Sequence, residues 1–213
     1  MSLFRPLLPL CAALFLAGGC ASPSVEQEAA PEFEAEGLHR VTSSGFESAY
    51  IRPGAGLSEY GAVHVDDLST SSLEVTQTTV SGTNRRDWQV TPERQQRLVE
   101  AWAAATARVF ADYPRQAEGK GTLRIQTSLT RVAPGRASSV NTTVGGAPIH
   151  GSSDVVDVSV EFRLLDANDG ELLAVIRDRR TIGSLQWTRA SGVDIVNLFN
   201  SWAALLHTRL SGR

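Results

Sequence analysis

Residues 155–182 read VVDVSVEFRLLDANDGELLAVIRDRRTI, and the rest of the chain is best understood from this stretch. Apolar and polar side chains alternate strictly from Val156 to Leu164, which is typical of a β-strand with one buried face. Residues 166–170, DANDG, predict a hairpin turn in which Gly170 supplies the positive φ. Residues 171–182 then return as the partner strand, so the centre of the sheet is predicted to be antiparallel.

The flanking sequence predicts a neighbouring strand and two helices. Residues 123–130 alternate in the same way and indicate another half-buried strand. Thr91, Pro92 and Glu93 mark a helix start, because threonine caps the first turn, proline tolerates the first helical position and an acid suits the helix dipole. Apolar residues at helical spacing over 195–210 predict an amphipathic C-terminal helix.

Weaker signals complete the predicted fold. Residues 62–66 and 73–80 indicate short strands, and the Ser-, Thr- and Gly-rich residues 133–153 are expected to form a long loop. The fold class is therefore α+β. We expect a two-layer sandwich, a mainly antiparallel sheet with two amphipathic helices packed on one face and the other face open.

The first twenty residues have the pattern of a bacterial export signal. Arg5 precedes a mostly apolar stretch over 7–16, which is shorter than the roughly 20 residues that a membrane-spanning helix needs. Residues 16–20, LAGGC, resemble a lipobox, which implies cleavage before Cys20 and a lipid on its thiol; plain secretion is the alternative. The same resemblance, with Ala21 rather than aspartate after the cysteine, implies the periplasmic leaflet of the outer membrane.

These features predict three regions. Residues 1–19 are expected to be a signal peptide, and residues 46–213 a single α+β domain. Residues 20–45 are expected to be the lipidated N-terminus and a disordered tether, because this stretch is acidic and poor in aromatic residues. The mature chain keeps only Cys20, so neither a disulfide nor a cysteine-based metal site is expected.

Composition and motifs indicate little chemistry. The net charge of −3 argues against a nucleic-acid partner. The four histidines do not share metal-ligand spacing, and Asp66 and Asp67 are adjacent on a predicted strand, so they point to opposite faces. Residues 150–154, HGSSD, are a weak hydrolase candidate, and residues 119–122, GKGT, lack the first glycine of a phosphate loop. We therefore predict no catalytic residues, no metal site and no cofactor.

Several segments resemble one bacterial lipoprotein family. They are YIRPGAGLSEY at 50–60, the helix start at Thr91, LDANDGEL at 165–172, the DRR run at 178–180 and Trp202 in the last helix. Over roughly residues 48–211 the chain resembles the family catalogued as domain of unknown function 3313. The resemblance implies a lipoprotein but brings no established activity or catalytic residues.

Three functional hypotheses remain open. The first is a non-enzymatic cell-envelope lipoprotein, an accessory or adaptor subunit that faces the periplasm and contacts another envelope protein, with the membrane bound through Cys20. Its expected partner surface is the polar side of the sheet, at Arg124, Gln126, Glu161 and Arg163. The alternative is a small-ligand or glycan-binding module that uses the 133–153 loop. The third is an enzyme of unrecognised type.

Overall fold

The central hairpin forms as the alternation predicts. In the computed structural model, β9 (Ser152–Asp166) pairs antiparallel with β10 (Leu172–Gly183). Gly170 closes the turn between them with a φ of 76°. The structure describes residues 22–76, 89–114, 119–138, 142–144, 147–149, 152–183, 187 and 193–212, with the side chains of 135–154 outside the description.

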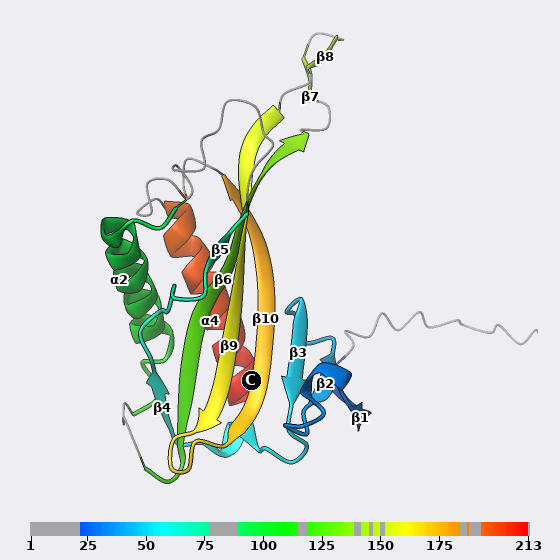
Figure 1. Cartoon of the computed structure of the whole chain (residues 1–213), viewed down its shortest axis with the longest axis vertical. Helices are drawn as coiled ribbons and strands as arrows, with labels where there is room; N and C mark the ends of the chain where they lie inside the picture. Colours follow the sequence, from blue (N-terminus) through cyan, green and yellow to red (C-terminus); the bar gives the residue numbers. More distant parts are fainter. Residues whose placement is uncertain are drawn as a thin grey trace, which may run out of the picture.

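The hairpin lies inside a larger, twisted sheet (Figure 1). The other strands are β1 (Ser24–Ala29), β2 (His39–Thr42), β3 (Ser48–Ile51), β4 (Ala62–Val65), β5 (Glu74–Val75) and β6 (Thr122–Ser138). The order is β1-β2-β3-β10-β9-β6-β4, and β5 also pairs with β6. β4 and β5 run parallel to β6, whereas the other pairs in this sheet are antiparallel. Of the expected strand at 73–80, the structure places Glu74 and Val75; residues 77–80 lie outside the described part.

Two helices, α2 (Pro92–Val109) and α4 (Val193–Ser211), cover one face of this sheet (Figure 1). Thr91 caps α2 as expected, since its hydroxyl accepts a hydrogen bond from the backbone N–H of Arg94 at 3.3 Å. Trp102 of α2 and Trp202 of α4 pack on Phe162 of β9, with ring centroids 5.9 and 6.4 Å apart. Burial of these rings between the layers confirms the predicted α+β sandwich.

A buried carboxylate ties the two layers together. Asp178 of β10 points toward the helices, and its Oδ2 accepts a hydrogen bond from Trp202 Nε1 at 2.7 Å. Its Oδ1 accepts from the backbone N–H of Glu47 at 3.0 Å, and Arg180 Nε lies 2.7 Å from Oδ2. Asp178 therefore links α4, the central sheet and the turn before β3.

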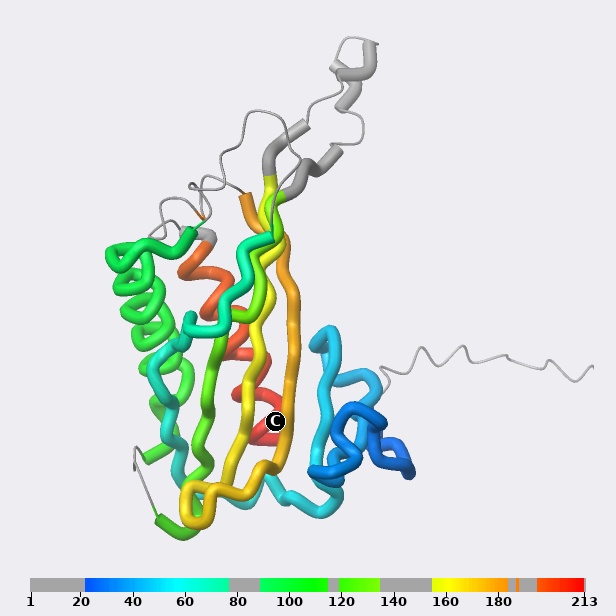
Figure 2. Tube along the Cα trace, viewed as in Figure 1, coloured from blue at the N-terminus to red at the C-terminus, as the bar shows by residue number. Residues whose placement is uncertain are grey.

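The structure differs from the disordered tether that the acidic composition predicted for residues 20–45. From Ser24 onward the chain forms β1, η1 (Pro31–Phe33), β2 and β3, an N-terminal lobe of residues 24–51 that extends the sheet beyond β10 (Figure 2). Phe33 and Leu38 are buried in it, together with Val175 of β10. Burial of these side chains against β10, together with the pairing of β1, β2 and β3, orders the acidic segment.

The predicted loop over 133–153 is also corrected. β6 continues to Ser138 and β9 begins at Ser152, so the two strands stay paired through this region. β7 (Thr142–Val144) and β8 (Ala147–Ile149) form a small hairpin beyond them. The polar composition suggested a loop, but a strand pair satisfies its own backbone hydrogen bonds and needs no apolar face. The hypothesis of a ligand lid made by this segment depends on side chains outside the description.

The expected signal peptide and Cys20 lie outside the described residues. Within the part of the chain that the structure describes, no helix is long and apolar enough to cross a membrane.

Candidate functional site on the open sheet face

The four residues of the expected partner surface lie on one face of the sheet. Gln126 of β6 is directly opposite Arg163 of β9. Ser128 is opposite Glu161 in the same ladder, and Glu161 is opposite Arg177 of β10. Their neighbours of the other parity point toward the helices. We call this surface the polar sheet face; it comprises His64, Asp66, Arg124, Gln126, Ser128, Glu161, Arg163 and Arg177.

At the β4 edge of the polar sheet face, Asp66 holds two basic side chains. Arg124 forms a bidentate ion pair with its carboxylate, in which Nε lies 3.0 Å from Oδ1 and Nη2 lies 2.9 Å from Oδ2. His64 Nε2 lies 3.3 Å from Oδ1. Because β4 and β6 run parallel with His64 opposite Arg124, the sheet itself brings these three groups together.

In the middle of the face, Glu161 is shared by two arginines. Arg177 Nε donates to its Oε2 at 2.9 Å, and Arg163 Nη1 lies 3.5 Å from its Oε1. The guanidinium of Arg177 also stacks on the ring of Phe33 at 5.2 Å, so the N-terminal lobe bounds the polar sheet face on this side. The alternation of the sequence predicted that Arg163 and Glu161 lie on this face. It did not predict the contact between Arg177 and Phe33, because residues 20–45 were expected to be disordered.

The three guanidinium groups remain open to solvent. The side chains of Arg124, Arg163 and Arg177 are 47, 41 and 44% exposed. Ion pairs at this exposure contribute only about 0–1 kcal/mol each to folding. The guanidinium groups are therefore accessible to another molecule, whereas the carboxylates of Asp66 and Glu161, 20 and 18% exposed, are mostly buried.

The same geometry argues against a hydrolytic triad on this face. His64 is held by Asp66, as the base of a triad would be. Ser128, however, lies four residues along β6 from Arg124, the register partner of His64, which is roughly 13 Å at about 3.3 Å per residue. Among the described residues there is also no group of three His, Cys, Asp or Glu side chains that could hold a metal ion.

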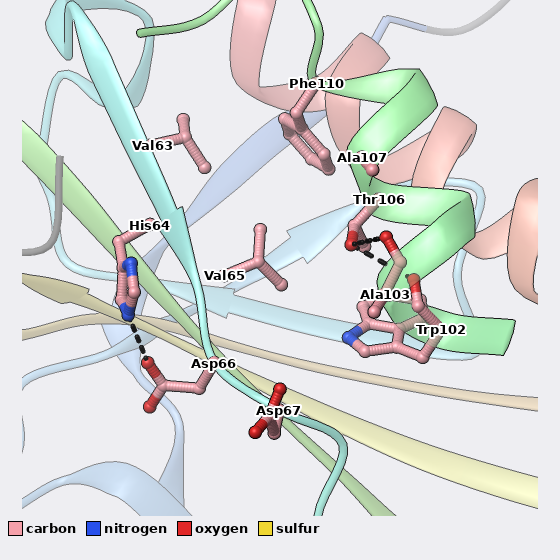
Figure 3. Close-up of a pocket in the computed structure, with 10 residues that line it drawn as sticks. All are labelled: Val63, His64, Val65, Asp66, Asp67, Trp102, Ala103, Thr106, Ala107 and Phe110. Atoms are coloured by element: carbon pink, nitrogen blue, oxygen red, sulfur yellow. Dashed lines mark hydrogen bonds and ion pairs between the residues drawn. The ribbon is translucent and has the colours of Figure 1, made fainter. Parts of the chain in front are cut away.

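The weaker motifs of the sequence take structural positions or lie outside the description. Gly121 adopts a φ of 79° immediately before Thr122 begins β6, so residues 119–122 form the entry to a strand. Asp67 points away from Asp66, to the other side of β4 (Figure 3), so the two carboxylates do not form a pair. The side chains of residues 150–154 are not among those described.

A hydrogen bond between a tyrosine and a glutamate lies at the edge of the lobe. The Tyr50 hydroxyl donates a hydrogen bond to Glu32 Oε1. That bond lowers the pKa of the Glu32 carboxyl, while burial of the phenol and the same bond raise the pKa of Tyr50. The pair fixes η1 against β3 and so holds Phe33 under Arg177.

The fold and this face define a class of protein: a two-layer α+β domain with one face covered by helices and the other partly open and charged. The chain belongs to the family described as "Protein of unknown function (DUF3313)", whose model matches residues 34–206. No curated protein matches the sequence significantly.

Solved structures offer only distant similarities. A PelC dodecamer from Paraburkholderia phytofirmans is 13% identical, with 70% of this chain and 88% of that chain covered and a TM-score of 0.34. A putative neuraminyllactose-binding hemagglutinin homolog from Helicobacter pylori is 10% identical (72 and 83% covered, TM-score 0.33). A minor lipoprotein from Acinetobacter baumannii is 11% identical (72 and 94% covered, TM-score 0.30). At these values nothing about function follows from the similarities.

Proposed function

We propose that this protein is a non-enzymatic cell-envelope lipoprotein, anchored through Cys20 to the periplasmic leaflet of the outer membrane, that acts as an accessory or adaptor subunit. Its polar sheet face binds another envelope protein. The observation that carries the proposal is the placement of three half-exposed arginines, from three different strands, on one open face of the sheet.

The chemistry of this face specifies the partner. Arginine presents a planar fork of donors that matches a carboxylate, so the complementary surface is rich in Asp or Glu. The continuous ladders between β6, β9 and β10 hold the arginines at fixed spacing, which reduces the conformational entropy lost on binding. Charge complementarity of this kind contributes specificity and association rate more than affinity.

Site-specific photo-crosslinking in intact cells tests the proposal. A photoreactive amino acid at Gln126 lies in the centre of the polar sheet face, whereas one at Ala104 lies on an exposed position of α2 and serves as the control. We expect a discrete crosslinked protein from position 126 that is absent from position 104. The same adducts at both positions, or none at 126, would contradict the proposal.

Charge reversal provides the second arm. The double variant Arg124→Glu/Arg163→Glu should abolish the adduct from position 126, because like charges at an interface cost several kcal/mol. Arg108→Glu/Lys120→Glu changes the net charge by the same amount at exposed positions outside the face and should leave the adduct intact. Both variants must be present at wild-type levels; equal crosslinking in all three proteins would show that Arg124 and Arg163 do not bind the partner.

A further inference from the structure

A second site lies on the other side of β4, away from the polar sheet face. A cavity of about 380 Å³ opens between β4 and α2. Val63 and Val65 point from β4 toward α2, whereas His64 and Asp66 project from the opposite side of the strand (Figure 3). The cavity lining also includes His64 and Asp66 of the polar sheet face, but the space itself lies on the α2 side of β4, and no described residue of the segment over 133–153 lines it.

Trp102 supplies the observation that points to a ligand. The residue is 1% exposed, and its Nε1 is buried without a hydrogen-bond partner among the described residues. In Figure 3 the indole nitrogen lies on the side of the ring that faces β4. An indole nitrogen can only donate, and buried donors in proteins are nearly always satisfied, so an acceptor is missing at this position.

The other residues that line the cavity leave space for an acceptor beside Trp102 Nε1, and the hydroxyl group among them already donates its hydrogen bond elsewhere. The Thr106 hydroxyl already donates within its own helix, to the carbonyl oxygens of Trp102 at 3.0 Å and Ala103 at 3.2 Å. The short side chains of Ala103 and Ala107 keep the space open, and Phe110 adds an apolar wall.

Charge and size limit what fits. The exposed Asp67 carboxylate lines the cavity and disfavours an anion. A volume of about 380 Å³ holds roughly a dozen groups the size of a water molecule, at about 30 Å³ each. It lies at the lower end of the range for small-molecule sites, about 300–1,000 Å³.

We propose that this cavity binds a small neutral organic molecule with an apolar body and a carbonyl oxygen that accepts the hydrogen bond of Trp102 Nε1. The apolar body packs on Val65, Ala107 and Phe110. The site does not depend on the partner proposed above.

The test follows the indole N–H by NMR. ¹⁵N-labelled tryptophan in the secreted Cys20→Ser variant, which carries the whole domain without the lipid, gives one indole resonance for each of the four tryptophans. Trp102→Phe identifies the resonance of Trp102. The probes are cyclohexanone, which has a carbonyl acceptor, and methylenecyclohexane, which has the same shape without the oxygen.

We expect cyclohexanone to move the Trp102 proton downfield and saturably, with a millimolar Kd, while methylenecyclohexane causes no downfield shift. Ala107→Leu fills the cavity and should weaken cyclohexanone binding at least tenfold. Ala104→Leu makes the same change at an exposed position of the same helix and should leave binding unchanged. The inference is overturned if the shift of the Trp102 resonance does not saturate with cyclohexanone, if both probes act alike, or if the two leucine variants bind cyclohexanone equally. In that case, magnetisation transfer to the Trp102 N–H from water alone would show that the cavity holds only water.

Discussion

The hydrogen bond between Trp202 and Asp178 should be one of the strongest single contacts of the domain. Both side chains are buried, and the Nε1 to Oδ2 distance is 2.7 Å. Hydrogen bonds to charged groups contribute about 1.5–3 kcal/mol. The ion pair of Asp178 with Arg180 adds at most about 1 kcal/mol because the arginine side chain is 43% exposed.

Asp178→Ala should therefore destabilise the protein by about 2–4 kcal/mol, since it leaves the Trp202 indole buried without an acceptor. Trp202→Phe removes the donor and should cost less, because Asp178 keeps Arg180 and the backbone N–H of Glu47. Removing both groups leaves neither a buried indole without an acceptor nor a buried carboxylate without that donor, although the backbone N–H of Glu47 loses its acceptor as it does in Asp178→Ala alone. The double variant should thus be more stable than the sum of the single losses predicts, by a coupling energy of about 1.5–3 kcal/mol.

Urea unfolding of the four proteins, followed by far-ultraviolet circular dichroism, measures this coupling. The change is large against the roughly 5–15 kcal/mol that stabilises an ordinary domain. An unchanged slope with denaturant would show that only stability, and not the denatured state, differs between variants. Additive effects, within about 0.5 kcal/mol, would refute the reasoning and show that the bond contributes no net stability.

Three further predictions can be tested separately. Trp202→Ala should lower the free energy of unfolding by about 3–5 kcal/mol, because it leaves a cavity between α4 and β9; an unchanged melting temperature would contradict this packing. Cys20→Ser should abolish palmitate labelling and release the protein from membranes, as measured by fractionation. The pKa of Glu32 is lowered from its usual 4.5 by the Tyr50 hydroxyl, so the stability from this pair is present above pH 4.5 and is lost as pH falls through the folded-state pKa. Glu32→Gln should therefore make hydrogen exchange in the N-terminal lobe less sensitive to acid, and equal acid sensitivity would exclude the pair as its cause.

The central hairpin could be predicted from sequence because its evidence is local. Strict alternation over residues 156–164 fixes which side chains are buried, and the same parity placed Gln126 and Arg163 on one face. That Gln126 lies directly opposite Arg163 depends on the register between β6 and β9, which the alternation of each strand does not determine. The helix start at Thr91 was equally local, since the cap, the proline and the acid are consecutive.

The N-terminal lobe and the cavity could not be predicted because their evidence is distant in sequence. Phe33 and Leu38 are isolated apolar residues in an acidic stretch, and the site that buries them includes Val175 of β10, far along the chain. The missing acceptor at Trp102 is a property of packing: the sequence places the indole on the apolar side of α2, but not the space beside its nitrogen.

The ordering of the N-terminal lobe changes how far the domain can travel from the bilayer. β1 begins at Ser24, four residues after Cys20. At most about 3.6 Å per residue, this link spans no more than about 15 Å. If Cys20 carries the lipid, as proposed, this short link keeps the domain close to the lipid headgroups, whereas a long disordered tether would let it move farther away. On the function proposed above, the polar sheet face, which that lobe bounds, would therefore meet its partner close to the membrane surface.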